Sequence, residues 1–146
     1  MRQAIEEFLK CKSLAVIGVS RSGRKFGNSA LKELAERGYR VFPVHPIASE
    51  ISGVQCSPNL ASVQGKVDGV LVSVKPRDTL QVLREAAAIG LKRIWLQQGA
   101  ESPEADALAR SLDLDPVTKR CILMYAAPVG GFHAWHRGFF RLLGKL

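Results

Sequence analysis

The chain has 146 residues, of which 47% are hydrophobic and 23% are charged, a balance typical of one folded domain with a single core. No apolar run approaches the roughly 20 residues of a membrane span, and the first residues form no apolar secretion core. We therefore expect a cytoplasmic protein without a signal peptide or a transmembrane helix.

The net charge is strongly positive, because 21 lysines and arginines outnumber 13 acidic residues and give a formal charge of +8. Such an excess can serve nucleic acid, a membrane surface or a phosphate-rich ligand. The basic residues are spread over many segments, with local clusters at 21–25 and 137–145. This dispersion disfavours a nucleic-acid partner.

The first third of the chain reads as helix, strand and helix. Residues 3–11 place their apolar side chains on one face, which predicts a short amphipathic helix at the edge of the domain. Residues 14–19 are apolar on both faces, as in a central parallel strand. A helical pattern follows over 28–37 and ends at Gly38, which acts as its C-terminal cap.

The second strand is predicted at residues 39–46, where Pro43 requires an edge, a bulge or the end of a strand. Residues 47–66 read as a loop with a short strand near 54–55 and one turn of helix near 59–63. The remaining elements are strands at 67–74, 92–97 and 120–125, and helices at about 78–89 and 101–111.

Strands and helices thus alternate along nearly the whole chain. This alternation predicts a mainly parallel sheet with helices on both faces. The right-handed crossover rule makes a Rossmann-like, doubly wound α/β sheet of five or six strands the simplest topology. We expect one domain over residues 1–127, followed by a separate C-terminal segment.

The turn after the first strand carries the most informative chemistry. Glycines stand at 18, 23 and 27, and the same turn holds Arg21, Arg24 and Lys25 before the helix begins. A strand, a glycine-rich turn and a helix together deliver backbone N–H groups and a positive helix dipole to a phosphate. The turns after the other strands are also polar, small or basic, and ligands bind at this edge of such sheets.

The spacing of these glycines matches neither the G-x-G-x-x-G of dinucleotide enzymes nor a Walker A loop. The second strand ends in Val44-His45-Pro46, without the acidic residue that would bind the ribose of NAD. NAD is therefore disfavoured. NADP and coenzyme A (CoA), which carry an additional phosphate, both remain compatible with the basic residues.

Four ordered segments of the sequence resemble a known family. They are residues 15–20, 37–46, 67–76 and 94–99, and the resemblance covers roughly residues 5–124. The family is that of the small single-domain CoA-binding proteins, whose fold is that of the N-terminal CoA-binding domain of the succinyl-CoA synthetase α subunit. The chain departs from the family pattern at His45, where relatives commonly have Asn, and after Cys121, where many continue with Pro-Lys.

The resemblance implies where CoA would lie. The backbone at residues 18–20 would meet the pyrophosphate, residues 45–46 and 73–76 would flank the nucleotide, and Gln97 and Gly99 would border the pantetheine channel. The full set of predicted ligand-contact residues is Gly18, Val19, Ser20, Arg21, Arg24, Lys25, Gly27, Asn28, His45, Pro46, Ser73, Val74, Lys75, Pro76, Gln97 and Gly99.

Catalytic residues and metal ligands are not predicted. Cys11, Cys56 and Cys121 are odd in number and widely spaced, which indicates free thiols instead of a disulfide framework or a zinc site. Cys121 is expected to be a buried structural thiol at the start of the last strand. We therefore expect a CoA or acyl-CoA binding protein that is not catalytic by itself, with an NADP-dependent oxidoreductase or an acyl-CoA-handling subunit as the alternative.

The segment 128–146 is predicted to form a basic amphipathic helix. Its apolar face holds Phe132, Trp135, Phe139, Leu142 and Leu143, and its basic strip holds His133, Arg137, Arg141 and Lys145. Packing on the domain itself or on a second copy in a homodimer is favoured over binding to an anionic membrane. A third alternative is a protein-interaction module in which this helix docks on another macromolecule.

Overall fold

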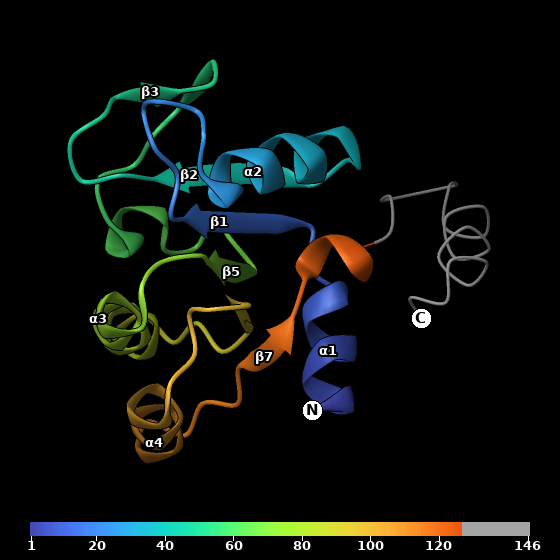
Figure 1. Ribbon diagram of the computed structural model, residues 1–146, viewed down its shortest axis with the longest axis vertical. Coiled ribbons are helices and arrows are strands. Elements are labelled where there is room, and N and C mark those ends of the chain that lie inside the picture. Colours follow the sequence, from blue (N-terminus) through green and yellow to red (C-terminus); the bar gives the residue numbers. More distant parts are fainter. Residues whose placement is uncertain (127–146) are drawn as a thin grey trace.

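The computed structural model describes residues 1–126, and its central feature is a five-stranded sheet (Figure 1). All four pairings between neighbouring strands are parallel. The predicted Rossmann-like α/β sheet is thus confirmed, with five strands. In their spatial order the strands are β2 (Arg40–Val44), β1 (Ser13–Ile17), β5 (Gly69–Val72), β6 (Ile94–Gln97) and β7 (Val117–Arg120).

Helices cover both faces of the sheet and bury two separate apolar clusters. One cluster joins the sheet to α1 (Arg2–Leu9) and α2 (Phe26–Glu36), and the other joins it to α3 (Pro76–Ala88) and α4 (Pro103–Ser111). The central strands β5 and β6 are buried along their whole length, as their apolar side chains on both faces require. Among the helices of residues 1–126, none is long and apolar enough to cross a membrane.

Two helices begin two residues before their predicted start. The helix α2 starts at Phe26 and α3 at Pro76, where the fixed backbone of proline suits the first turn. Both early starts matter for the site, because they bring Lys25 and Lys75 to the N-cap positions. The expected glycine cap of α2 is present, since Gly38 has a φ of +94°.

The strand β2 forms one edge of the sheet, which is where Pro43 can be accommodated. Its outer side is covered by Ser57, which donates its N–H to Pro43 O (2.9 Å) and accepts the N–H of His45 (2.9 Å). The intervening segment contains an antiparallel hairpin of β3 (Glu50–Ile51) and β4 (Val54–Gln55), followed by the 3-10 helix η1 (Leu60–Val63). The predicted short strand and helical turn are therefore confirmed.

The predicted last strand at 120–125 is wrong. The strand β7 ends at Arg120, and Ile122–Met124 form the 3-10 helix η2. Lys119 has a φ of +59° and the pairing with β6 shifts register there, so the ladder stops. The apolar run after Cys121 owes its burial to packing on α1 and α2, which the sequence pattern alone does not distinguish from a strand.

Trp95 of β6 contacts both α1 and β7 at this edge of the sheet. Its buried ring stands edge-on to Phe8 at a centroid distance of 5.3 Å, and its Nε1–H donates to Arg120 O (3.0 Å). The predicted domain end at 127 and the predicted helix at 128–146 lie outside the described residues.

Candidate ligand-binding site

The turns that follow β1, β5 and β6 meet at the carboxyl edge of the sheet, which is on the left in Figure 1. They enclose a cavity of about 260 Å³. The cavity brings together six of the predicted contact residues and adds Gln98 and Ala100. Its lining consists of Lys25, Ser73, Val74, Lys75, Pro76, Gln98, Gly99 and Ala100.

Gly18 allows the turn after β1 to lie directly against the turn after β5. Its φ is +112°, and a Cβ added there would stand 2.0 Å from Ser73 O. A Cβ on Gly27 would likewise stand 2.3 Å from Gly18 O, at the first turn of α2. Only glycine fits at these two positions, because no real Cβ approaches a backbone oxygen so closely. The two glycines thus hold the strand end, the helix start and the neighbouring turn in contact.

Asn28 fixes the turn from the helix side. Its side chain is 5% exposed, and its Oδ1 accepts the Ser20 N–H (3.0 Å) and the Ser20 hydroxyl (3.2 Å). Its Nδ2 donates to Ser20 O at 2.9 Å. One amide therefore satisfies the donor and the acceptor of the same backbone residue. This arrangement holds the backbone at Ser20 in one orientation beside the start of α2.

The site is electrostatically suited to an anion. Arg21, Arg24, Lys25 and Lys75 are exposed, and within residues 1–126 none of them forms an ion pair with a carboxylate. The helices α2 and α3 both begin at this edge, and neither N-cap side chain bonds to the first turn. Backbone N–H groups and the positive ends of two helix dipoles therefore remain available here.

Two predicted residues use their side chains for structure. Gln97 is 5% exposed and its Oε1 accepts the N–H of Ile122 (3.1 Å), so Gln98 is the glutamine that lines the cavity. The imidazole Nδ1 of His45 accepts hydrogen bonds from the backbone N–H groups of Ile47 and Ala48 in its own loop. Gln98 could have been found from the sequence. Residues two positions apart in a strand point to the same face, so Gln97 shares the face of Trp95, whereas Gln98 lies past the end of the strand.

Two of the three cysteines, Cys11 and Cys56, have raised pKa values, which disfavours the reactive thiolate form. Burial raises the pKa of Cys11 to about 11, and burial together with the nearby Glu50 raises the pKa of Cys56. The expectation that Cys121 is buried at the start of a strand is wrong, since it is partly exposed and follows β7. Among residues 1–126, no three His, Cys, Asp or Glu side chains gather in a metal-binding cluster.

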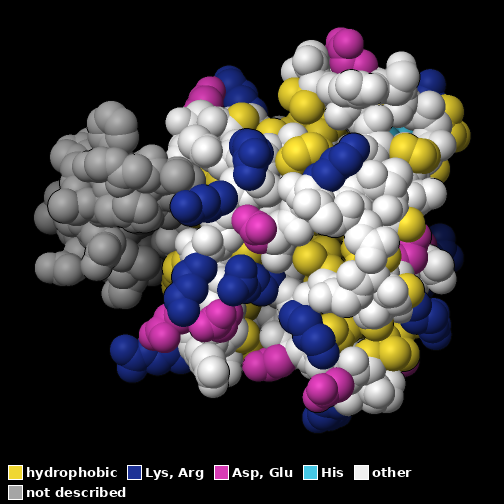
Figure 2. Space-filling view, turned by 180° about the vertical axis from the view of Figure 1, so that it is seen from behind, with side chains coloured by type: hydrophobic (Ala, Val, Ile, Leu, Met, Phe, Trp, Pro, Cys, Tyr) yellow, Lys and Arg dark blue, Asp and Glu magenta, His cyan; other side chains and the backbone are white. Residues whose placement is uncertain are grey.

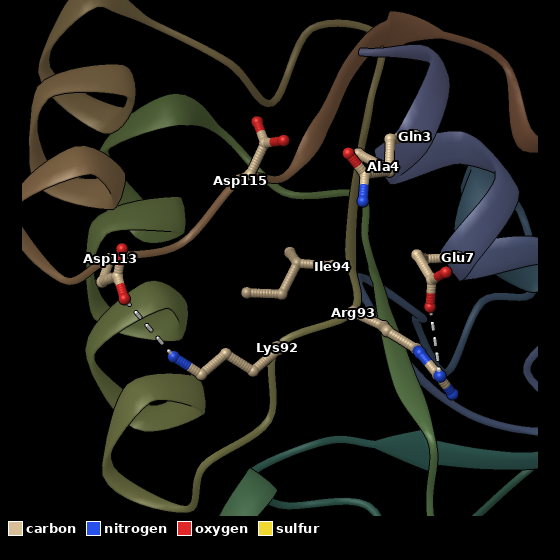
Figure 3. A pocket seen from close by; sticks show the side chains of 8 residues that line it. All are labelled: Gln3, Ala4, Glu7, Lys92, Arg93, Ile94, Asp113 and Asp115. Atoms are coloured by element: carbon tan, nitrogen blue, oxygen red, sulfur yellow. Dashed lines mark hydrogen bonds and ion pairs between the residues drawn. The ribbon is translucent and has the colours of Figure 1, made fainter.

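Two other cavities are present in the described part of the chain. One, of about 480 Å³, lies at the amino ends of β6 and β7 against α1, and contains none of the predicted residues (Figure 3). Four of its five charged residues are paired with one another, Arg93 with Glu7 (3.4 Å) and Lys92 with Asp113 (3.9 Å), and the fifth is Asp115. Figure 2 shows basic and acidic side chains interspersed over the surface seen from behind. The other, of about 460 Å³, lies between α2 and β4, and its lining includes the predicted contact residue Asn28.

Comparison with known proteins places this geometry in a family. The model of the CoA binding domain matches residues 12–127. The chain belongs to the CoA binding domain family. The resemblance noted from the four sequence segments is thereby confirmed, and the carboxyl edge of the sheet is the edge at which such a doubly wound domain binds its ligands.

Relatives of this CoA-binding-domain protein include both short proteins and large enzymes. It is 27% identical over 119 residues to the uncharacterized protein YneT of Bacillus subtilis, covering 81% of this chain and 88% of that protein. A conserved hypothetical protein from Pyrococcus furiosus has a solved structure with a TM-score of 0.73 and 35% identity, covering 77% of this chain and 97% of the other.

The enzyme relatives are much longer than this chain. It is 30% identical over 97 residues to the ADP-forming acetate–CoA ligase II of Archaeoglobus fulgidus, which is 65% of this chain. The chain spans only 14% of the length of that ligase. The likeness is therefore to one domain of the enzyme.

Proposed function

We propose that this protein binds CoA or an acyl-CoA at the carboxyl edge of the sheet and is not catalytic by itself. The observation that carries the proposal is the convergence on one cavity of Lys25 and Lys75, which form no ion pair within residues 1–126, and of two helix N-termini without a side-chain cap. CoA carries a pyrophosphate and a 3′-phosphate, and both types of group bind to backbone N–H groups and basic side chains. The family membership favours CoA over other phosphate-bearing ligands.

In the proposed complex, the pyrophosphate lies against the backbone of residues 18–20 at the start of α2. Arg21, Arg24, Lys25 and Lys75 neutralise the phosphates. The loop at His45 and Pro46 flanks the adenosine, and the turn at 73–76 lines its other side. The pantetheine arm leaves past Gly99. The proposal assigns no proton transfer or covalent step to this chain. Burial raises the pKa of the Cys11 thiol to about 11 and also raises that of Cys56, which disfavours the reactive thiolate at these two positions.

Calorimetric titration with CoA, dephospho-CoA, NADP and NAD tests the proposal. We expect CoA to bind and dephospho-CoA to bind at least about tenfold more weakly, because a hydrogen-bonded contact to a charged group contributes about 1.5–3 kcal/mol. NAD is expected not to bind, since the end of β2 has no acidic residue for its ribose.

Three results would contradict the proposal or one of its parts. Binding of NADP without CoA would place the protein among NADP-dependent oxidoreductases. Absence of binding to all four compounds would leave the fold intact and move the search for a function to residues 128–146. Equal affinities for CoA and dephospho-CoA would remove the role of the basic residues at the 3′-phosphate.

A further inference from the structure

The cavity of about 460 Å³ between α2 and the β3–β4 hairpin, here called the α2 groove, begins at the glycine-rich turn after β1. Gly23 of that turn and Asn28 of the first turn of α2 line one end of it. From there the lining follows one flank of α2 through Ser29 and Lys32 to Glu36, at the spacing of three and four residues that places helical side chains on one face. The α2 groove is therefore continuous with the turn proposed to hold the pyrophosphate.

The opposite wall of the α2 groove is the β3–β4 hairpin, which lies with α2 at the top of Figure 1. The hairpin is anchored to the helix, because Ile51 is buried in the same apolar cluster as Leu31. Ser52 and Gly53 at its tip have φ values of +53° and +78°, as the two central residues of a tight hairpin turn do, and Ser52 lines the groove. Packing thus holds both walls of the groove in place.

Lys32 is the basic residue in the lining of the α2 groove. It is exposed, and within residues 1–126 it forms no ion pair. Glu36 follows four residues later and lines the groove as well, but the two side chains do not pair, and a lysine that precedes a glutamate is the less favourable order for such a pair. The ammonium group of Lys32 is therefore available to an anion that enters from the turn after β1.

We propose that the 3′-phosphate of CoA lies in the α2 groove, where Lys32 distinguishes CoA from dephospho-CoA. The proposal rests on the proposed CoA-binding function. In CoA the pyrophosphate stands between the pantetheine arm and the ribose that carries the 3′-phosphate, and the turn after β1 likewise stands between two cavities, since Lys25 lines one and Gly23 the other. The pantetheine arm is proposed to leave past Gly99 in the first cavity, which directs the 3′-phosphate to the second. Lys32 lies four residues, about 6 Å along the helix, beyond Asn28, a step comparable to the length of one ribose.

Lys32→Gln is the variant that tests this assignment, because it removes the charge and keeps a side chain of high helix propensity. The quantity to measure is the ratio of the affinities for CoA and dephospho-CoA, by calorimetry at about pH 7.5, where the 3′-phosphate is mostly doubly charged. We expect this ratio to fall about tenfold. A tenfold change corresponds to about 1.4 kcal/mol, close to the lower end for a hydrogen bond to a charged group. Lys32→Arg keeps the charge and should retain most of the preference for CoA.

Two further variants separate a local charge effect from an effect of net charge. Glu36→Gln removes the carboxylate at the far end of the α2 groove and should raise the preference for CoA about twofold to threefold at low salt, an effect that added salt should screen. Lys66→Gln is the matched control. Lys66 is also exposed and without an ion pair within residues 1–126, but it lies before β5, at the amino edge of the sheet. Its replacement should leave the ratio unchanged.

The possible outcomes keep the two proposals apart. CoA binding with an unchanged ratio in Lys32→Gln would overturn the assignment of the 3′-phosphate to the α2 groove and leave the proposed function standing. Loss of the preference in Lys75→Gln, and not in Lys32→Gln, would place the 3′-phosphate in the cavity at the turns after β5 and β6. An equal fall of the ratio in Lys66→Gln would show that net charge alone sets the preference. Failure of the wild type to bind CoA would overturn the proposed function and this assignment together.

Discussion

Replacement of Gly18 by alanine is expected to abolish measurable CoA binding and to lower the free energy of unfolding by about 3 kcal/mol or more. The added Cβ would stand 2.0 Å from Ser73 O, and the φ of +112° is itself unfavourable for a residue with a side chain. The turns after β1 and β5 must move apart to relieve the contact. Since both turns line the proposed site, the geometry of the phosphate-binding backbone changes with them.

Gly90→Ala is the matched control for this variant. Gly90 also has a positive φ, of +72°, but a Cβ there would meet no atom within 4 Å, and it lies at the far end of α3 from the site. Its replacement should cost about 1 kcal/mol, the penalty of a left-handed backbone alone, and leave CoA affinity unchanged. Urea denaturation and calorimetric titration measure both quantities. A Gly18→Ala protein that binds CoA like the wild type would refute the proposed position of the pyrophosphate.

Asn28→Asp is expected to weaken CoA binding by at least about 100-fold, since it removes a buried hydrogen bond and adds a negative charge near the phosphates. A carboxylate can still accept the N–H of Ser20, but it cannot donate to Ser20 O as Nδ2 does at 2.9 Å. Two oxygens would then face each other without a proton between them. The turn at Ser20 would lose its fixed orientation.

Asn28→Ala separates the effect of the lost hydrogen bonds from the effect of the added negative charge. It removes the bonds to Ser20 without adding a charge, so we expect an intermediate loss of about tenfold in affinity. Both variants should lower the free energy of unfolding by about 1–3 kcal/mol, because backbone groups of Ser20 lose their partners. Equal affinities of Asn28→Asp and Asn28→Ala, measured by calorimetry at low salt, would show that no anionic group of the ligand lies near residue 28.

The fold could be predicted from the sequence because its central strands are apolar on both faces and its helices alternate with them. The strand β7 was missed for a physical reason. It is an edge strand of mixed polarity, Val117–Arg120, while the apolar run that follows it is buried by α1 and α2 without pairing as a strand. An apolar pattern indicates burial, and in this segment the burial comes from the packing of residues 122–126 on helices and not from strand pairing.

The site was predictable at the level of turns, not of side chains. The glycines of the first turn could be read as a phosphate-binding pattern, but their steric role depends on Ser73, a neighbour 55 positions along the chain from Gly18. Gln97 is hydrogen-bonded to the segment that follows β7, and Gln98 lines the cavity instead. This difference depends on the path of that segment, which was wrongly predicted. The hydrogen bonds of His45 depend on the shape of a loop that carries no regular pattern.

The central claim is that CoA binds at the carboxyl edge of the sheet, and its location can be measured by amide chemical-shift changes during titration with CoA. We expect the largest changes at Gly18, Val19 and Ser20, at 73–75 and at Gly99. The larger cavity at the opposite edge, lined by Glu7, Arg93 and Asp113 among others, should show no change. Changes centred on that cavity, with the turn after β1 unaffected, would contradict the account.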